Sequence, residues 1–214
     1  DMSNLVTDTL KFLVNSIGER PVGKPGNQKA NQYLKERFTR LGYKTIEFEF
    51  DCTLWQKGVS SAGTDLQFSI LPGPFSKGVE GVYPVVAVES LKQLQAVDLK
   101  EKILLLIGEI AKDPLMPRDF PFFYPDEHKA VIDTLEAKQP KAIIAGTGKH
   151  PFCGHSPFSL FEDGNFDIPN AYTDPETAEK LAKLKGDMRV RIISNRKSGK
   201  SQQVIASKAG TNGK

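Results

Sequence analysis

The first fifty residues combine two stripes of apolar positions at helical spacing with one segment in which apolar and polar residues alternate. The first stripe comprises Leu10, Leu13, Val14 and Ile17. Because these residues recur every three or four positions, they predict an amphipathic helix. Ser3 or Asn4 is the expected N-cap, and Gly18 follows the last apolar position, where a helix commonly ends.

A second stripe follows a turn rich in proline and glycine, and it comprises Ala30, Tyr33, Leu34, Phe38 and Leu41. Its spacing predicts another helix, closed by Gly42. Ile46, Phe48 and Phe50 then alternate with glutamates, which predicts a strand buried on one face. Two helices and one strand leave the strand without a partner, so we interpret them as the edge of a larger α/β domain.

The character of the chain changes near Trp55, where glycine and proline become frequent between short β-prone stretches. The apolar runs in this region are residues 85–88, 103–107, 142–145 and 190–193. Helical patterns lie among them, at residues 125–137 and 174–184, and the mixture indicates a second module of α+β type. Val204 and Ile205 begin a further strand.

The order of these elements predicts a mixed α/β fold with a discontinuous first domain. Residues 1–55 and 198–214 would form the incomplete edge of that domain, and residues 56–197 would form an inserted, β-rich α+β domain. Because the two ends of an insertion must lie close together, we expect the strands near Phe50 and Val204 to be neighbours in one sheet. The apolar face of Phe48 and Phe50 should then be exposed, or covered by another copy of the chain through self-association of the truncated sheet.

Composition and charge narrow the classes of partner. Lysine and arginine number 29 against 26 aspartates and glutamates, and the resulting net charge of +3 is too small and dispersed to indicate a nucleic-acid partner. The longest apolar run, residues 103–107, is much shorter than the ~20 residues that span a bilayer, so we expect no membrane partner. Cys52 and Cys153 are expected to be free thiols. No segment assigns a cellular compartment.

Five segments are informative because of the order in which they follow one another along the chain. They are Ser16–Ala30 (SIGERPVGKPGNQKA), Val97–Gly108, Lys141–Ala145, Phe166–Ala171 and Gln203–Ala206. The first resembles the turn between two N-terminal helices in the aminopeptidases of metallopeptidase family 28. The next three resemble parts of the protease-associated (PA) domain that is inserted in some of these enzymes. The last resembles the strand that returns the chain to the peptidase sheet.

The resemblance covers nearly the whole chain and implies a zinc-exopeptidase α/β fold with two zinc ions. In this family a His-x-Asp element follows the returning strand, and a Glu-Glu pair supplies a general base and a ligand. None of His128, His150 and His155 lies in such an element, and the sequence has no Glu-Glu pair. We therefore expect no catalytic residue and no family zinc ligand in this chain, which alone should be inactive. The parent enzyme would bind its peptide substrate through a catalytic domain encoded after Lys214.

One local cluster offers a different metal site. His150, Cys153 and His155 are three metal-capable side chains within six residues, but a structural zinc site needs a fourth ligand, such as Asp163 or His128. An ordinary exposed loop is the preferred interpretation. A Cys-His nucleophile pair lacks an orienting partner, and the apparent phosphate loop ending at Ser201 lacks its first glycine, so both are rejected.

Three further features are expected to be structural. The aromatic segment Phe120–Pro125 should pack against the core of the inserted module rather than contact a partner. Arg20 should orient its turn through hydrogen bonds, and Trp55 should pack near the domain junction.

Two functions therefore stand at this point. The favoured one is the non-catalytic N-terminal and PA portion of a zinc-dependent aminopeptidase that hydrolyses N-terminal residues from peptides. The alternative is a PA-type protein-interaction module of a protein without catalytic activity, because the same fold serves both roles. The side-chain preference of the parent enzyme is not encoded in any motif found here.

Overall fold

The computed structural model describes residues 2–113, 115–116, 118, 120–150, 154–155 and 167–210, with only the backbone described for residues 2, 3, 149, 150, 154 and 155. The chain divides into two compact units. Unit 1 consists of Asp1–Leu54 and Lys197–Lys214, and unit 2 consists of Trp55–Arg196.

Unit 1 begins with helix α1 (Met2–Lys11), which continues as a π-helix, η1 (Phe12–Ile17). Gly18 ends this helix with a φ of 74°, and its N–H donates to the carbonyl of Leu13, so the predicted C-cap is confirmed. The predicted N-cap is wrong, because the helix already begins at Met2 and includes both Ser3 and Asn4. The apolar stripe starts at Leu10, more than two turns inside the helix, so it did not determine where the helix begins.

Helix α2 (Pro25–Arg40) follows the turn. Pro25 occupies its first position, where the fixed φ of proline suits a helix and its missing N–H has no intrahelical partner to lose. Arg37 and Arg40 lie in its last turn, where cations complement the helix dipole. Gly42 follows the C-cap with a φ of 77°, as expected of a glycine that closes a helix.

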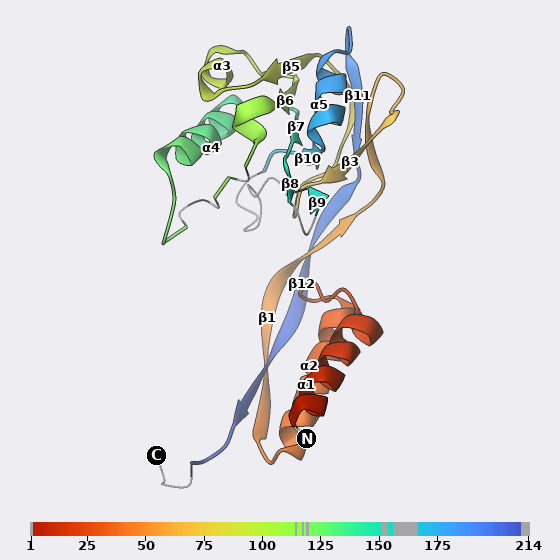
Figure 1. Ribbon diagram of the computed structural model, residues 1–214, viewed down its shortest axis with the longest axis vertical. Coiled ribbons are helices and arrows are strands. Elements are labelled where there is room, and N and C mark those ends of the chain that lie inside the picture. Colours follow the sequence, from red (N-terminus) through yellow and green to blue (C-terminus); the bar gives the residue numbers. More distant parts are fainter. Residues whose placement is uncertain are drawn as a thin grey trace. The chain divides into compact units, whose positions relative to one another are not determined.

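Two strands complete unit 1 and connect it to unit 2. They are β1 (Lys44–Lys57) and β12 (Ser194–Ser207), and they form a two-stranded sheet, called the ribbon below. Figure 1 shows the two strands side by side and running in opposite directions. The predicted pairing of the two ends of the chain is therefore confirmed, and both strands are much longer than the apolar patterns that predicted them.

Unit 2 contains an eight-stranded sheet with the order β4-β11-β2-β3-β10-β7-β6-β5. Its strands are β2 (Ser60–Gly63), β3 (Phe68–Pro72), β4 (Val79–Tyr83), β5 (Val85–Val88), β6 (Ile103–Leu106), β7 (Ala142–Gly146), β10 (Asn170–Thr173) and β11 (Met188–Ile192). The four strands from β10 to β5 pair in parallel, and the pairs from β4 to β10 are antiparallel. A short hairpin, β8 (Lys149–His150) and β9 (Gly154–His155), forms a separate sheet.

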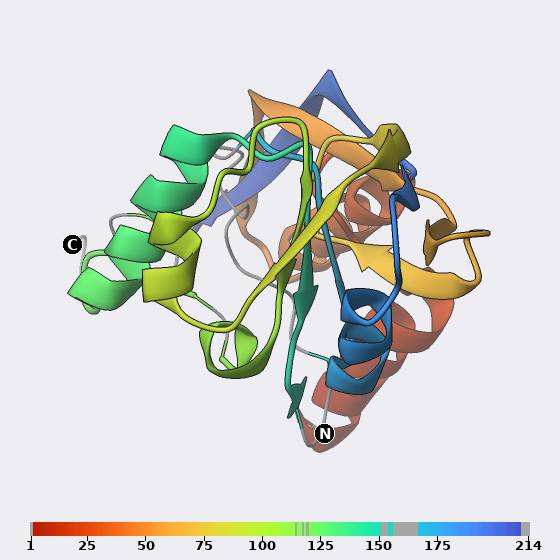
Figure 2. The same cartoon turned by 90° about the horizontal axis from the view of Figure 1, so that it is seen from above.

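Helices cover both faces of the parallel half of this sheet. The elements are α3 (Leu91–Ala96), the 3-10 helix η2 (Gly108–Ala111), α4 (Asp126–Lys138) and α5 (Pro175–Ala182). Seen from above, α3 and α4 lie on one side of the strands and α5 lies on the other (Figure 2). All four residues of β6 are fully buried, as expected of a parallel strand covered on both faces.

Two hydrophobic clusters form the core of unit 2, one on each face of the sheet. Leu104 and Leu106 of β6 belong to the cluster with Leu94 of α3 and Leu135 of α4. The alternate residues of β6 and β7, among them Leu105, belong to the cluster with the apolar side of α5. The period-2 geometry of the strands therefore divides one apolar run between two cores.

Candidate functional site

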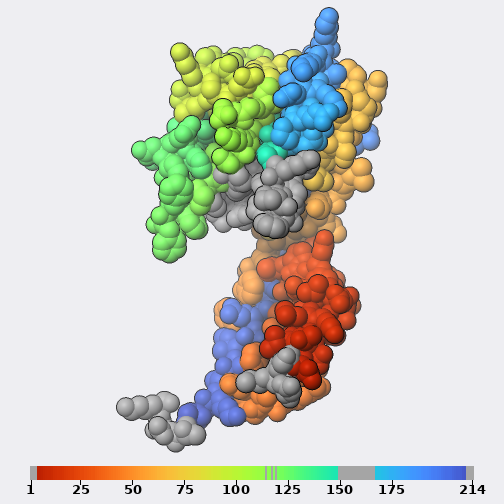
Figure 3. Space-filling model, in the orientation of Figure 1, coloured from red at the N-terminus to blue at the C-terminus, as the bar shows by residue number. Residues whose placement is uncertain are grey.

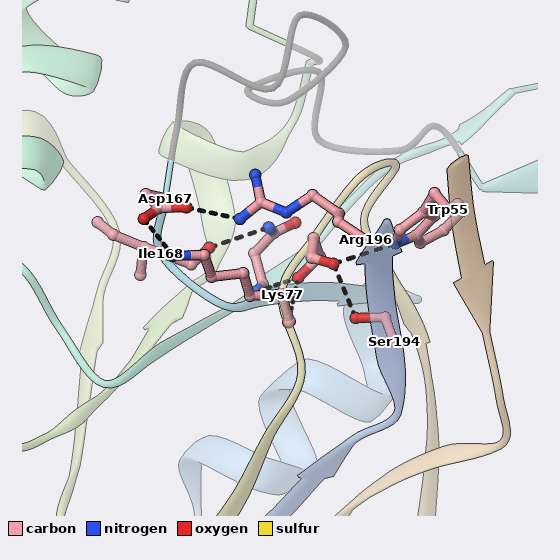
Figure 4. Close-up of polar contacts among 8 residues, drawn as sticks. Trp55, Lys77, Asp167, Ile168, Ser194 and Arg196 are labelled. Atoms are coloured by element: carbon pink, nitrogen blue, oxygen red, sulfur yellow. Dashed lines mark hydrogen bonds and ion pairs between the residues drawn. The ribbon is translucent and has the colours of Figure 1, made fainter. Parts of the chain in front are cut away.

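A polar cluster in unit 2 joins Trp55, near the end of β1, and Ser194, at the start of β12, to two segments, residues 73–77 and 167–170. Ser76 is its centre: the residue is 1% exposed, and its carbonyl accepts hydrogen bonds from Trp55 Nε1 at 3.0 Å and from Ser194 Oγ at 2.8 Å. Its hydroxyl donates to the carbonyl of Lys77 at 2.8 Å and accepts from the backbone N–H of Asn170 at 2.9 Å. Figure 4 shows the side chains of Trp55 and Ser194, with dashed lines for their polar contacts, beside Lys77. One small buried residue thus joins four parts of the chain.

An ion-pair network borders this cluster (Figure 4). The carboxylate of Asp167 accepts hydrogen bonds from Lys77 Nζ and, at 2.5 Å, from Arg196. The hydrogen bond from Lys77, followed by that from Arg196, holds the pKa of Asp167 below its ordinary value. An ionised carboxylate with two cationic partners has no proton to donate at neutral pH, so Asp167 is suited to hold segments together rather than to act as a general acid.

Next to the hydrogen bonds of Ser76 and the ion pairs of Asp167, Asn170 packs closely against Gly73. Asn170 is 1% exposed, its Nδ2 donates to the carbonyl of Ile168 at 3.2 Å, and its Oδ1 has no hydrogen-bond partner among the described residues. A Cβ atom added at Gly73 would lie 1.8 Å from that Oδ1. Glycine is therefore required at this position by close approach of the amide, not by backbone conformation. Asp167, Ile168 and Asn170 all fall in the segment Phe166–Ala171, which the sequence had already singled out.

The structure confirms the structural role expected of Arg20. Its guanidinium donates to the carbonyls of Leu13 and Gly18, the latter at 2.6 Å. These carbonyls lie at the end of η1, where the last carbonyl groups of a helix need donors from elsewhere. Trp55 was expected to pack, and its ring lies 6.0 Å from that of Phe75 in addition to its hydrogen bond with Ser76. The hydrogen bond could not have been inferred from spacing alone.

The expectation for the aromatic segment was wrong in part. Phe122 is 88% exposed and Phe123 is 61% exposed, so neither ring packs in the core. Tyr124 alone contacts the cluster beneath α3 and α4. The segment connects η2 with α4 and contains prolines at both ends, and this geometry directs only the last aromatic ring inward.

No donor set for zinc is present among the described residues. They contain no group of three or more histidine, cysteine, aspartate or glutamate side chains close enough to hold a metal ion. His128 Nδ1 accepts a hydrogen bond from the backbone N–H of Met116 at 2.9 Å. The side chains of His150, Cys153, His155 and Asp163 lie outside the described residues. Cys52 is a free thiol.

Unit 1 contains a groove of ≈ 670 Å³ between α2 and the ribbon. Two carboxylates that line the groove have cationic partners: Glu47 lies 2.7 Å from Lys35 Nζ, and Glu49 lies 2.5 Å from Lys200 Nζ. Gln32 donates to Glu36 at 2.8 Å. Among the described residues, these carboxylates do not form a metal-binding group.

Within the described part of the chain, no helix combines the length and the hydropathy that are needed to cross a membrane.

Comparisons with known proteins identify the fold but not a family by sequence. No family model matches the chain, and no curated protein matches its sequence. Solved structures do match. The aminopeptidase from Aneurinibacillus sp. strain AM-1 is similar with a TM-score of 0.65 and 19% identity, over 96% of this chain and 48% of that structure.

Two further structures agree with that match. BSAP, a zinc aminopeptidase from Bacillus subtilis, has a TM-score of 0.66 and 18% identity over 96% of this chain and 46% of its own. A peptidase M28 precursor from Shewanella amazonensis SB2B has a TM-score of 0.61 and 18% identity, over 95% and 50% respectively. The chain thus spans about half the length of these structures. At such identities the likeness shows a shared fold.

Proposed function

We propose that this chain is the N-terminal portion of a zinc-dependent aminopeptidase of metallopeptidase family 28. In this proposal, the helices and the ribbon of unit 1 belong to the peptidase domain, and unit 2 is an inserted PA domain. The observation that carries it is the extent of the fold likeness, which includes 95–96% of this chain in two aminopeptidase structures and one peptidase M28 precursor. A likeness confined to unit 2 would fit many unrelated proteins.

The chemistry is assigned to residues that follow Lys214. Residues beyond Lys214 would hold the zinc, which would supply the activation of water for hydrolysis of the first peptide bond. The described residues do not fit zinc, as no metal-ligand group is present among them. In this proposal the role of the chain is non-catalytic: unit 1 supplies the edge of the peptidase sheet, and unit 2 shapes or covers the access of peptides to the catalytic domain.

The polar cluster around Ser76 supports this role for unit 2. It fastens the strand that enters the module, at Trp55, to the strand that leaves it, at Ser194 and Arg196. An inserted domain needs its two ends held together so that the host sheet can continue undisturbed. In this proposal, residues 73–77 and 167–170 hold the two ends of the inserted domain together.

The experiment that tests the proposal begins with the coding sequence beyond Lys214. We expect a His-x-Asp element soon after the ribbon and a Glu-Glu pair further on. The longer protein should hydrolyse an aminoacyl chromogenic amide, lose that activity with a chelator and regain it with zinc, whereas the 214-residue chain should show no hydrolysis above the blank. A continuation without these elements would favour the alternative, a PA-type interaction module. So would a zinc-loaded longer protein that cleaves no N-terminal residue.

A further inference from the structure

Three phenylalanines in the segment between η2 and α4 face the solvent. Phe120, Phe122 and Phe123 are 38%, 88% and 61% exposed, respectively, and are called the aromatic surface below. The rings of Phe120 and Phe122 meet edge to face, with their centroids 5.8 Å apart. The green segment that leads into α4 lies at the surface of unit 2 in the space-filling view (Figure 3). Covering one such side chain contributes roughly 1.5–3 kcal/mol, so neighbouring exposed rings mark a surface that gains free energy from a partner.

The residues on either side of the aromatic surface are fixed to the body of unit 2. The backbone N–H of Met116 donates to His128 Nδ1 at 2.9 Å, and the guanidinium of Arg118 donates to the carboxylate of Glu136. Both acceptors belong to α4. On the other side, Tyr124 packs against the cluster beneath α3 and α4. The exposure of the phenylalanines is therefore built into the fold, and a surface that is already ordered loses less conformational entropy on binding.

Unpaired carboxylates adjoin the aromatic surface. Asp126 and Glu127 open α4, and both are exposed. Within the part of the chain that the structure describes, neither forms an ion pair, and the next cation along the sequence, Lys129, pairs with neither. Asp126 is three residues from Phe123, a stretch that spans at most roughly 11 Å. One ligand can therefore touch the rings and the carboxylates at the same time.

Arginine is the side chain that satisfies both components of this surface. Its planar guanidinium stacks on aromatic faces and presents a fork of donors to a carboxylate. Lysine matches the carboxylates but offers no plane to stack. Nucleic acids and anionic membranes carry the same sign of charge as Asp126 and Glu127, so the charge of this surface disfavours both. The area of the three phenylalanine rings also calls for apolar side chains beside the arginine.

We propose that the aromatic surface, together with Asp126 and Glu127, is a docking site for a segment of another protein that carries arginine next to apolar residues. In this arrangement, the apolar side chains of the partner cover Phe122 and Phe123, and the guanidinium lies between a phenylalanine ring and the carboxylates. The inference is independent of the proposed aminopeptidase function, because binding at this surface involves no hydrolysis.

Fluorescence anisotropy of the 214-residue chain with a labelled peptide tests the proposal. The peptide is acetylated and amidated and contains arginines among leucines, and two further versions carry citrulline or glutamate in place of every arginine. The arginine peptide should bind in a saturable manner. The citrulline peptide keeps the shape of the side chain but not its charge, so it should bind at least ~10-fold more weakly. The glutamate peptide should not bind, because its charges repel those of α4.

Variants of the chain separate the two components of the surface. Phe122→Ser combined with Phe123→Ser should weaken binding of the arginine peptide at least ~10-fold, through lost apolar contact. Asp126→Asn combined with Glu127→Gln should remove the preference for arginine over citrulline and retain the weaker binding of the citrulline peptide. Val59→Ser, at an apolar position of unit 2 that is 90% exposed, is the matched control and should leave both affinities unchanged. Because all of these side chains are exposed, thermal unfolding of the variants should match the wild type, which separates lost binding from lost folding.

Four results would overturn the proposal. The first is an arginine peptide that does not bind, and the second is a citrulline peptide that binds equally well. The third is a chain that binds vesicles of phosphatidylcholine and phosphatidylserine through Phe122 and Phe123 but does not bind the peptide, since the surface would then be a membrane contact. The fourth is a longer protein that does not bind the peptide that the 214-residue chain binds, since another part of the same protein would then cover the surface.

Discussion

Units 1 and 2 have similar amphipathic patterns in sequence, but they bury their apolar side chains to very different degrees. In unit 2 the apolar runs of β6 and β7 are fully enclosed by helices on both faces of the sheet. In unit 1 the stripes that predicted α1 and β1 are real, yet residues such as Val14 and Phe48 remain largely exposed. The difference teaches that an amphipathic pattern encodes a face to be buried but does not supply the surface that buries it.

The largest expected effect comes from opening the core of unit 2. Leu105 is fully buried, so Leu105→Ala should lower the free energy of unfolding by about 2–5 kcal/mol through lost burial and a residual cavity. Val14→Ala is the matched change in unit 1 and should cost less than about 0.5 kcal/mol, because Val14 is 59% exposed. Denaturant titrations of both variants measure the contrast. Equal losses would show that unit 1 has a core of its own.

A smaller loss is expected where unit 2 packs most closely around a polar group. Gly73→Ala would place a Cβ atom 1.8 Å from Asn170 Oδ1, and the shift needed to relieve this clash should cost about 1–3 kcal/mol. Adding Asn170→Ala removes the obstructing amide. The double variant should therefore lose less stability than the sum of the single variants, as measured in a double-mutant cycle. Strict additivity would contradict the proposed contact.

The hydrogen bonds to the Ser76 carbonyl should contribute less again. Ser194→Ala removes the donor at 2.8 Å while Trp55 Nε1 still donates to the same carbonyl, so the expected loss is about 1 kcal/mol. Ser198→Ala, at an exposed position on the same strand, is the control and should be neutral. If thermal unfolding shows no difference between the two variants, the cluster does not stabilise the entry and exit strands.

The smallest effect is expected for Asp167→Asn, because the Asp167 side chain is 61% exposed and salt bridges of this kind contribute less than about 1 kcal/mol. The direction in which this stability difference changes with pH can be stated. Lys77 and Arg196 lower the pKa of Asp167 in the folded state, so the carboxylate adds stability above its unfolded pKa, and this stability is lost as the pH falls through the lowered, folded value. The difference between wild type and variant should thus be present at pH 7 and disappear in acid. A difference that grows in acid would contradict this account.

Much of the order of helices and strands could be predicted from the sequence, because the segments with strong periodicity form the elements that their periodicity predicts. The run at residues 85–88 became β5 without a change of bounds, and the helical pattern at residues 125–137 became α4, shifted by one residue. Helix α3 and the strands β2, β3, β4 and β10 were not predicted. They are short, and strands such as β2 (SSAG) carry no alternation that distinguishes them from turns.

The polar cluster was less accessible to sequence reasoning. Trp55, Ser76 and Arg196 are far apart in the chain, and only tertiary structure brings their hydrogen-bonding groups together. The segment containing Asp167 and Asn170 was marked by resemblance, but its hydrogen bonds with Ser76, Lys77 and Arg196 required coordinates. The exposure of Phe122 was missed for the opposite reason: aromatic content favours burial, and only the path of the segment reveals which ring turns inward.

Hydrogen exchange measured by mass spectrometry on the 214-residue chain tests the central contrast most directly. If unit 2 has an enclosed core and unit 1 does not, amides of β6 and β7 should exchange only through global unfolding, and those of α1 and η1 should exchange by local opening, at least ~100-fold faster. Protection of α1 and η1 equal to that of β6 and β7 in the 214-residue chain would contradict the account.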